Sequence, residues 1–371
     1  MYNDKKKKRK RKAPKKAILL LISIVLVLAV LITGLVMLLT KGREIKDTTV
    51  LLPFKASQDY FCVGETIVYV DGPNLTCIDA SLNSKWQLLM WASGLDYSAS
   101  DEMIVATSGS TIQVVDENSA LLFYGQIPEG VIKSSRAGKN KFAVYVDQPL
   151  ADSTLSYIEV FNTSGDMIYQ LPATDRNILD YGFDAESDEL YVLELSVSGV
   201  VPVSRICTYR PETQSMTGIN DLKDQLVSRV YLTGDRIYAM GTNSLTTFTS
   251  LKQTSKVLVY GWAVEDVCTV QENPVFVYVK SDEMDSAISV ARVIKASGGE
   301  IKINLPPGVI SVLNNGEKIY CFASDSIFVY TVEGKYQRTH ELPIAVDGAQ
   351  KAIDGYAFVT SGDAVYLLPL P

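Results

Sequence analysis

The sequence predicts an all-β fold, an eight-bladed β-propeller, preceded by one N-terminal transmembrane helix. Three observations favour the propeller: a short apolar strand recurs eight times, its starts lie 36 to 48 residues apart, and further strands flank each copy. Four short strands in a repeat of about 40 residues are typical of a propeller blade. The recurring strand covers residues 67–70, 103–106, 142–146, 190–194, 237–240, 275–279, 319–322 and 356–359.

Each recurring strand has companions on both sides. The strand before it often carries small residues, such as Ser98 and Ser134, and small side chains suit a crowded central axis. A third strand follows, and turn residues such as those at 116–119 and 162–165 then lead into a fourth. If the weak fifth unit is not a blade, the ring has seven blades instead of eight.

The two ends of the repeated region complement each other. The last unit stops before a fourth strand, and the segment near 48–54 has no unit of its own. We expect this N-terminal strand to pair with the last blade, because the pairing closes the ring and removes exposed strand edges. The propeller domain then covers residues 48–371.

The first 47 residues differ in composition from the rest. Residues 1–16 form a basic tail, and residues 17–40 contain no charged side chain. At 1.5 Å per residue, such a helix spans about 36 Å, which is enough to cross a hydrocarbon core of about 30 Å. The apolar run is too long for a secretory signal peptide. We therefore expect an uncleaved signal anchor at 17–40 and a linker at 41–47.

The positive charges predict the orientation of this anchor. Ten Lys and Arg residues precede the apolar run, whereas two, Lys41 and Arg43, follow it closely. This bias places the N-terminus in the cytoplasm. We expect one crossing of the plasma membrane, with the propeller extracytoplasmic. The lipid bilayer is then the partner of residues 17–40, and the basic tail either attracts anionic lipid or only fixes the topology.

The net charge of −7 is the sum of two unlike parts. Ten of the 35 basic residues but one of the 42 acidic residues lie in the tail, so the rest of the chain carries a net charge of −16. An acidic domain repels nucleic acid and other anionic polymers. We therefore expect a protein or glycan partner, cationic or neutral, and no nucleic acid.

The sequence shows no pattern for catalysis or metal binding. Its single histidine, His340, lies on a predicted outer strand, where a surface position is expected. A phosphate-binding loop, a G-x-S-x-G elbow and an H-E-x-x-H motif are all absent. The acidic runs at 116–117 and 282–285 lack the spacing of a calcium loop. We predict no catalytic residue, no cofactor and no metal.

The five cysteines fall in predicted strands and show no C-x-x-C spacing. We expect them to be small core side chains. If one disulfide forms, the options are Cys62–Cys77 within the first unit and Cys268–Cys321 between neighbouring units.

One turn carries a family resemblance. Residues 78–86, IDASLNSKW, resemble the ALDA-x-TG-x-x-x-W turn of quinoprotein-like (PQQ-like) propeller repeats. Those repeats place a docking Trp in nearly every blade, whereas this chain has three Trp in total. The layout also resembles uncharacterised membrane-anchored propeller proteins of Gram-positive bacteria. The resemblance implies a WD40-like or PQQ-like propeller and a Gram-positive source, and it brings no site residues with it.

Long loops predict a binding surface. The connection between the second and third strands is long in units three, four and six, at 147–154, 196–204 and 281–287. In propellers these connections share one face with those between blades, and function commonly lies on loops held by a rigid scaffold. We expect units three and four to build one raised sector, with neutral variation in loop length as the alternative. The candidate contact residues are Gln148, Pro149, Asp152, Val200, Val201, Pro202, Asp282 and Glu283.

Three hypotheses about function follow. The first is a membrane-tethered, extracytoplasmic binding or scaffold module without enzymatic activity. The second is a hydrolase or quinoprotein-like enzyme with its site at the mouth of the central channel, which carboxylates with raised pKa on the inner strands would favour. The third is a sensor, which would need a partner protein because the 16-residue tail is too short for an output domain.

Overall fold

A computed structural model of the chain describes residues 49–172, 177–184, 187–197, 199–270, 273–284 and 286–371. The predicted basic tail, signal anchor and linker lie outside the described residues. Within the described part, no helix is long and apolar enough to cross a membrane.

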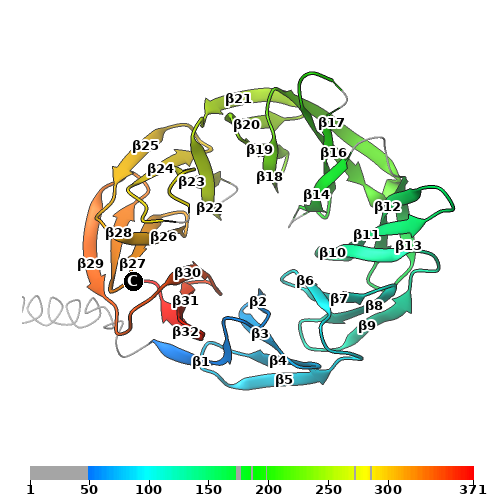
Figure 1. Cartoon of the computed structure of the whole chain (residues 1–371), viewed down its shortest axis with the longest axis horizontal. Helices are drawn as coiled ribbons and strands as arrows, with labels where there is room; N and C mark the ends of the chain where they lie inside the picture. Colours follow the sequence, from blue (N-terminus) through cyan, green and yellow to red (C-terminus); the bar gives the residue numbers. More distant parts are fainter. Residues whose placement is uncertain (1–48, 173–176, 185–186, 198, 271–272, 285) are drawn as a thin grey trace, which may run out of the picture.

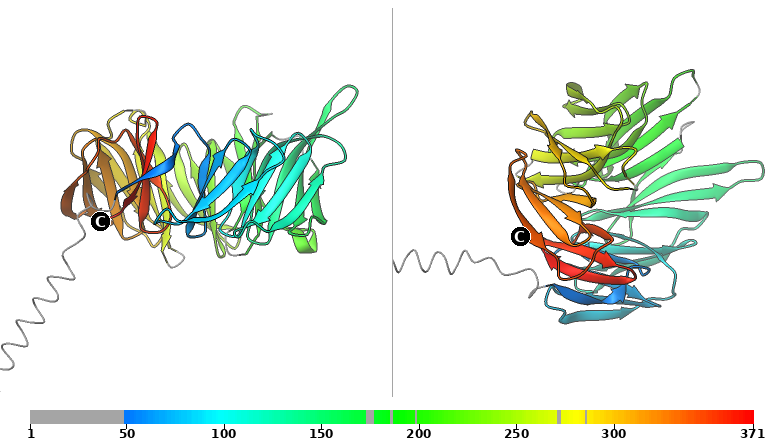
Figure 2. Two further views of the ribbon diagram at one scale, coloured as in Figure 1. Left: turned by 90° about the horizontal axis from the view of Figure 1, so that it is seen from below. Right: turned by 60° about the vertical axis from the view of Figure 1, so that its left-hand side comes forward.

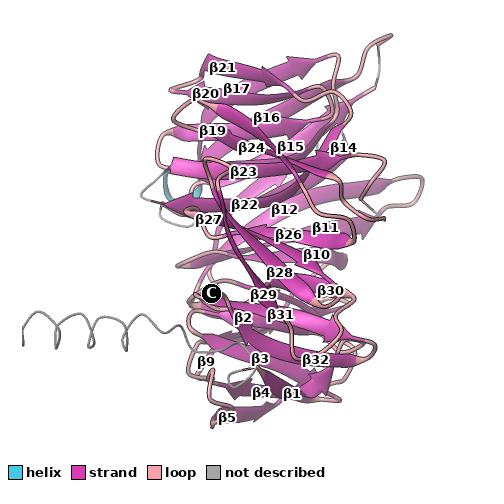
Figure 3. Cartoon of the chain, turned by 90° about the vertical axis from the view of Figure 1, so that its left-hand side faces the viewer, coloured by secondary structure: helices cyan, strands magenta, loops and turns pink. Residues whose placement is uncertain are grey.

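The described residues form eight antiparallel four-stranded sheets arranged around a central axis (Figure 1). The prediction of an eight-bladed propeller is confirmed. The seven-bladed alternative is wrong, because the weak fifth unit forms a complete sheet, β18 to β21. Strands dominate every blade, as the side view also shows (Figure 3).

Blades 1 to 4 follow one another along the chain, each with its first strand nearest the axis. Blade 1 contains β2 (Tyr60–Val63), β3 (Thr66–Asp71), β4 (Asn74–Ile78) and β5 (Ser84–Leu89). Blade 2 contains β6 (Asp96–Ala99), β7 (Met103–Ser108), β8 (Thr111–Asp116) and β9 (Leu121–Gln126). Blade 3 contains β10 (Val131–Ala137), β11 (Lys141–Pro149), β12 (Thr154–Asn162) and β13 (Met167–Pro172). Blade 4 contains β14 (Asn177–Phe183), β15 (Leu190–Ser196), β16 (Val203–Arg210), the 3-10 helix η2 (Pro211–Thr213) and β17 (Ser215–Lys223).

Blades 5 to 7 have the same order of strands. Blade 5 contains β18 (Val227–Thr233), β19 (Arg236–Gly241), β20 (Ser244–Thr249) and β21 (Lys252–Leu258). Blade 6 contains β22 (Trp262–Val270), β23 (Asn273–Lys280), β24 (Val290–Lys295) and β25 (Glu300–Asn304). Blade 7 contains β26 (Val309–Asn314), β27 (Lys318–Ala323), β28 (Ser326–Thr331) and β29 (Tyr336–Glu341).

Blade 8 combines both ends of the described chain. Its inner strands are β30 (Gly348–Lys351), β31 (Tyr356–Ser361) and β32 (Ala364–Pro369), and its outermost strand is β1 (Val50–Lys55). β1 pairs antiparallel with β32, so the N-terminal strand supplies the strand that the last unit lacks.

The alternating strand directions give the propeller two unlike faces. We call "loop face" the face that carries the connections between blades and those between the second and third strands of each blade. The "turn face" carries the other two connections of each blade. Because β1 begins on the turn face and β32 ends there, the chain enters and leaves the propeller on that side.

The core consists of eight clusters of buried apolar residues, one between each pair of neighbouring blades. The second and third strands of a blade pack on both sides, so they read as continuous apolar runs. In β7, for example, five of the six residues are buried. The fourth strand faces solvent on one side, and in β29 most side chains are exposed. Strand position within a blade is therefore visible in its sequence.

The turns between third and fourth strands share one chemistry. In three blades an Asp or Asn side chain, Asp79, Asp116 or Asn162, accepts hydrogen bonds from backbone N–H groups two and four residues further on, at 2.7–3.0 Å. Such a side chain replaces the missing backbone partners of a tight turn. The fourth residue of these turns has a positive φ, as in Ser119 and Gly165.

Two glycines at the same turn position allow a matched test. Gly298 and Gly334 have φ of +93° and +78°, but only at Gly334 would an added Cβ meet a neighbour, Ile301 Cδ1, at 2.7 Å. We expect Gly298→Ala to lower the free energy of unfolding by about 1 kcal/mol through backbone strain alone. Gly334→Ala should cost about 2 kcal/mol, because Ile301 must also move. Urea unfolding of both variants measures this; equal losses would contradict the steric part.

Candidate functional site

The predicted loop of blade 3 is mainly a strand extension. β11 continues to Pro149 and β12 begins at Thr154, so the connection shrinks to residues 150–153 and the expected loop at 147–154 is wrong in its bounds. The pairing extends because backbone N–H and C=O groups in a protruding segment need partners. The resulting hairpin stands out beyond the other connections (Figure 2).

The base of this hairpin is fixed by the connection from blade 2. The Tyr157 hydroxyl donates to the Glu129 carbonyl at 2.9 Å, and the Gln148 amide donates to the Glu129 carboxylate. Of the three predicted contact residues here, Gln148 therefore anchors the hairpin, while Pro149 and Asp152 are exposed near its tip.

The loop of blade 4 is also anchored at its base and apolar at its tip. The Pro202 carbonyl accepts a hydrogen bond from the Asp224 N–H at 3.2 Å. Buried Gln225, next in the chain, accepts from the Ser244 hydroxyl at 3.0 Å. Val200, by contrast, is fully exposed (102%), and its neighbour Val201 is 40% exposed. Two of the predicted contact residues are therefore solvent-exposed valines beside a hydrogen-bonded base.

The loop of blade 6 uses one of its predicted contact residues internally. The Glu283 carboxylate accepts hydrogen bonds from the Ser289 N–H at 2.9 Å, the Ser289 hydroxyl at 2.6 Å and Lys280 Nζ at 2.9 Å. These bonds, those of Ser289 first, lower the pKa of Glu283 to about 2. Glu283 holds the loop, Asp282 is exposed, and the adjacent Met284 is 50% exposed. Asp282 and Glu283 belong to blade 6, so blade 5 separates them from the sector of blades 3 and 4.

Exposed apolar side chains gather on the loop face over blades 3 to 6. In blades 7 and 8, the described loop-face connections contain no exposed large apolar residue. Apolar groups concentrated in one sector, and held on anchored loops, are typical of an interaction surface. We name these residues the apolar sector: Leu150, Val197, Val200, Val201, Leu226, Leu258, Tyr260 and Met284. Val200 and Val201 were candidate contact residues, and Leu150, Val197 and Met284 lie in the predicted loops. Leu226, Leu258 and Tyr260 escaped prediction, because they lie in or beside short inter-blade connections that loop length does not mark.

Two carboxyl groups with raised pKa lie on the inner strand β22. Burial raises the pKa of Asp266, and the Lys351 ammonium and Asn314 offset part of this effect. Asp266 receives Lys351 Nζ at 2.8 Å and both nitrogens of Asn314 at 2.7 and 2.8 Å. Burial, with the backbone N–H of Val312 opposing it, also raises the pKa of Glu265. Asp266 is occupied in joining the inner strands of blades 6, 7 and 8.

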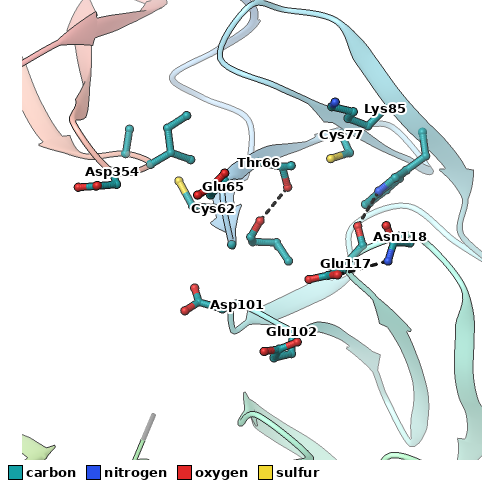
Figure 4. A pocket seen from close by; sticks show the side chains of 15 residues that line it. Cys62, Glu65, Thr66, Cys77, Lys85, Asp101, Glu102, Glu117, Asn118 and Asp354 are labelled. Carbon is teal, nitrogen blue, oxygen red and sulfur yellow. Dashed lines mark hydrogen bonds between the residues drawn. The ribbon is translucent and has the colours of Figure 1, made fainter. Parts of the chain in front are cut away.

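A hollow of about 830 Å³ lies on the turn face, between blades 8, 1 and 2 (Figure 4). This hollow could not be predicted from the sequence, because its residues come from turns of three different blades. Its only cation among the lining residues is Lys85. Its carboxylates are Glu65, Asp101, Glu102, Glu117 and Asp354.

Two cysteines line the same hollow. Burial, and secondarily the charge of Asp101, raises the pKa of Cys62 to about 12, and burial raises the pKa of Cys77. Both thiols are therefore protonated at neutral pH and are poor nucleophiles. All five cysteines are free in this structure, so neither optional disulfide is formed. In the part of the chain that is described, no group of His, Cys, Asp or Glu is arranged to hold a metal ion.

The turn that carries the family resemblance joins two blades. Trp86 lies on β5 of blade 1, and its indole N–H donates to the Glu117 carbonyl of blade 2 at 2.8 Å. The ring also packs against the apolar cluster between these blades. His340, on the outer strand β29, is partly buried rather than on the open surface, and burial, Arg338 and Lys318 lower its pKa.

Comparison with known proteins gives the fold. No protein-family model matches this chain, and no curated protein sequence matches it. BamB from Moraxella catarrhalis is 12% identical and covers 86% of this chain and 100% of its own, with a TM-score of 0.51. The WD40 domain of SCAP from fission yeast is 10% identical and covers 86% of this chain and 97% of its own, with a TM-score of 0.56. The computationally designed Ika8 protein is 12% identical and covers 89% of this chain and 100% of its own, with a TM-score of 0.54.

The fold and these likenesses define the chain as an eight-bladed β-propeller, similar in architecture to WD40 and BamB-like propellers. The WD40 domain supports the WD40-like part of the resemblance at the level of the fold. Identities this low carry no site residue to this chain, so its function has to be argued from its own surfaces.

Proposed function

We propose that the protein is a membrane-tethered, extracytoplasmic scaffold that binds a protein partner through the apolar sector. The observation that carries this proposal is the gathering of exposed apolar side chains on anchored loops of blades 3 to 6. Burying them against a partner is favourable by roughly 25 cal/mol for each Å² removed from water. Mainly aliphatic side chains favour a protein over a glycan, the other partner that the sequence allowed.

The path of the chain supports the proposed tether. β1 begins on the turn face, so an anchor at 17–40 joins the propeller on that side and the loop face points away from the bilayer. Residues 41–49 span about 30 Å when extended. This exceeds the Debye length of about 8 Å in physiological salt, so anionic lipid does not repel the acidic turn face strongly.

Site-specific photo-crosslinking in intact cells tests the proposal on the full chain. A photoreactive residue at position 200 should form a discrete adduct with another protein. One at position 325, in the short loop-face connection of blade 7, should not. Val201→Asp combined with Leu226→Asp should abolish the adduct while leaving the melting temperature nearly unchanged, because both side chains are exposed. No adduct from position 200, or one that survives both substitutions, would overturn the binding proposal.

The same cells test the tether. The full chain should sediment with membranes, and protease added outside protoplasts should digest the propeller. A chain whose first 47 residues are replaced by a cleaved signal peptide should appear in the medium. A propeller protected from external protease would contradict the proposed topology without affecting the binding result.

A further inference from the structure

A pocket on the loop face, between blades 5 and 6, is lined in part by Met284 of the apolar sector. Its volume is about 390 Å³, in the range of about 300–1,000 Å³ that is typical of ligand sites. Its walls include Met240, Trp262 and Met284. Methionine side chains are flexible and adapt to the shape of a bound group. No carboxylate is found among the described residues that line this pocket.

The pocket has one charged lining residue, Arg229. The pairing of β18 with β19 shifts register between Val227 and Arg229, and such a bulge redirects the side chains around it. Arg229 is exposed and forms no ion pair or hydrogen bond with any described residue. The charge of Arg229 lowers the pKa of Glu265, a carboxyl group that is bonded to the Val312 N–H and does not line the pocket.

Two other cations near the pocket already have carboxylate partners, whereas a third, Lys302, lies with its Nζ 5.4 Å from the centroid of the Trp262 ring and adds positive charge beside the pocket. Arg292, which lies over the Trp262 ring at 5.6 Å, forms two bonds of 2.8 Å with Glu300. Lys280 is bonded to Glu283 at 2.9 Å. Arg229 therefore has the guanidinium that is free to pair with a ligand carboxylate. Such a pairing is strong because both groups are charged.

A second polar group in the pocket wall lacks a partner. Tyr278 is 1% exposed, and its hydroxyl has no hydrogen-bond partner among the described residues. An unpaired buried hydroxyl is unfavourable, and an acceptor oxygen that enters the pocket can pair with it.

We propose that this pocket binds the C-terminal residue of a partner protein, with an apolar side chain against Trp262 and Met284 and the carboxylate on Arg229. An apolar side chain and a carboxylate occur on one residue only at the end of a chain. The inference rests on the proposed function, because Met284 belongs to both the pocket and the apolar sector, and it names the chemistry of the partner.

Fluorescence anisotropy of short labelled peptides on the full chain tests the pocket. The probes are peptides ending in Leu or Phe, each as free acid and as amide. We expect the acids to bind at least about tenfold more tightly than the amides. Arg229→Gln should reduce this acid-to-amide ratio to about one. Arg338→Gln, which removes an exposed guanidinium from blade 7, should leave the ratio unchanged.

Two tyrosines provide the matched control for the hydroxyl. Tyr278→Phe should weaken acid binding about fivefold. Tyr238→Phe should have no effect: its hydroxyl is also buried and unpaired in the same core cluster, but it does not line this pocket. Equal responses of the two variants would overturn the role of Tyr278.

The outcomes separate this inference from the proposed function. Absence of acid binding below about 1 mM, or an unchanged ratio in Arg229→Gln, overturns the pocket even if the crosslink at position 200 persists. Binding of the acid peptides without a crosslink at position 200 would support the pocket and contradict the proposed binding through the apolar sector. N-acetyl-leucine or N-acetyl-phenylalanine binding as tightly as the peptides would indicate a small apolar carboxylate and overturn the protein tail.

Discussion

Phe54→Ala should lower the free energy of unfolding by about 3–5 kcal/mol, the usual cost of removing a fully buried aromatic side chain. Phe54 is 3% exposed on β1. Its ring lies 4.8 Å from Tyr60, 5.0 Å from Tyr69 and 6.4 Å from Phe358. The substitution thus empties the cluster that joins blade 8 to blade 1, where the two ends of the described chain meet. Denaturant unfolding followed by tryptophan fluorescence measures the loss.

Leu51→Ala on the same strand is the control. Leu51 is 55% exposed, so its truncation should change stability by less than about 0.5 kcal/mol. If the two variants were equally stable, the packing of β1 against blade 1 would not contribute to the closed ring. An effect of Phe54→Ala on stability with an unchanged m-value would show that the ring still unfolds as one cooperative unit.

Lys351→Met should destabilise the protein by about 2 kcal/mol at pH 7, because it leaves the Asp266 carboxylate buried without its cation. The side chains of Asp266 and Lys351 are 12% and 36% exposed, so the effect falls below that of a fully buried pair. Lys55→Met is the control, because it breaks an ion pair between exposed side chains: Lys55 is 69% exposed and Asp363 is 52% exposed. It should lower the free energy of unfolding by at most about 0.5 kcal/mol.

The loss caused by Lys351→Met should shrink as the pH falls. Burial raises the folded-state pKa of Asp266 above its ordinary value of 3.8, so the folded state binds the proton more tightly than the unfolded chain. The favourable contribution of Asp266 to the free energy of unfolding is therefore fully present below the pKa that this group has in the unfolded chain. It is lost as the pH rises through the pKa that the group has in the folded state. Without Lys351 the folded pKa rises further, so the variant differs most from the parent at neutral pH. A loss independent of pH between 4 and 7 would contradict this account.

Much of the fold was predictable because the information is local. β7 is a second strand and has five of its six residues buried, whereas β29 is a fourth strand with mostly exposed side chains. The same difference appears in the sequence as an apolar run and a polar run. The side chains of Asp79 and Asp116 close turns through bonds within four residues. The bounds at 147–154 were wrong because a loop and an extended hairpin have similar composition there.

The binding surfaces were only partly predictable. Val200 and Val201 could be singled out by loop length, but Glu283 could not be recognised as an internal loop anchor, because Lys280 and Ser289 bind it from opposite sides of the loop. The turn-face hollow combines turns of blades 8, 1 and 2, and no spacing in the sequence brings Asp354 beside Glu65.

The sequence indicated the repeated unit and a ring of eight blades, with seven as the alternative, and it predicts an anchor at 17–40. Tertiary structure alone decided which side chains meet between blades. Arg229 and Trp262 are 33 positions apart and belong to different sheets, and their shared pocket exists only because blades 5 and 6 dock through a common apolar core. Strand pairing within a blade follows from local pattern and turn chemistry, whereas the angle and depth of blade docking depend on how side chains of separate repeats fill one interface.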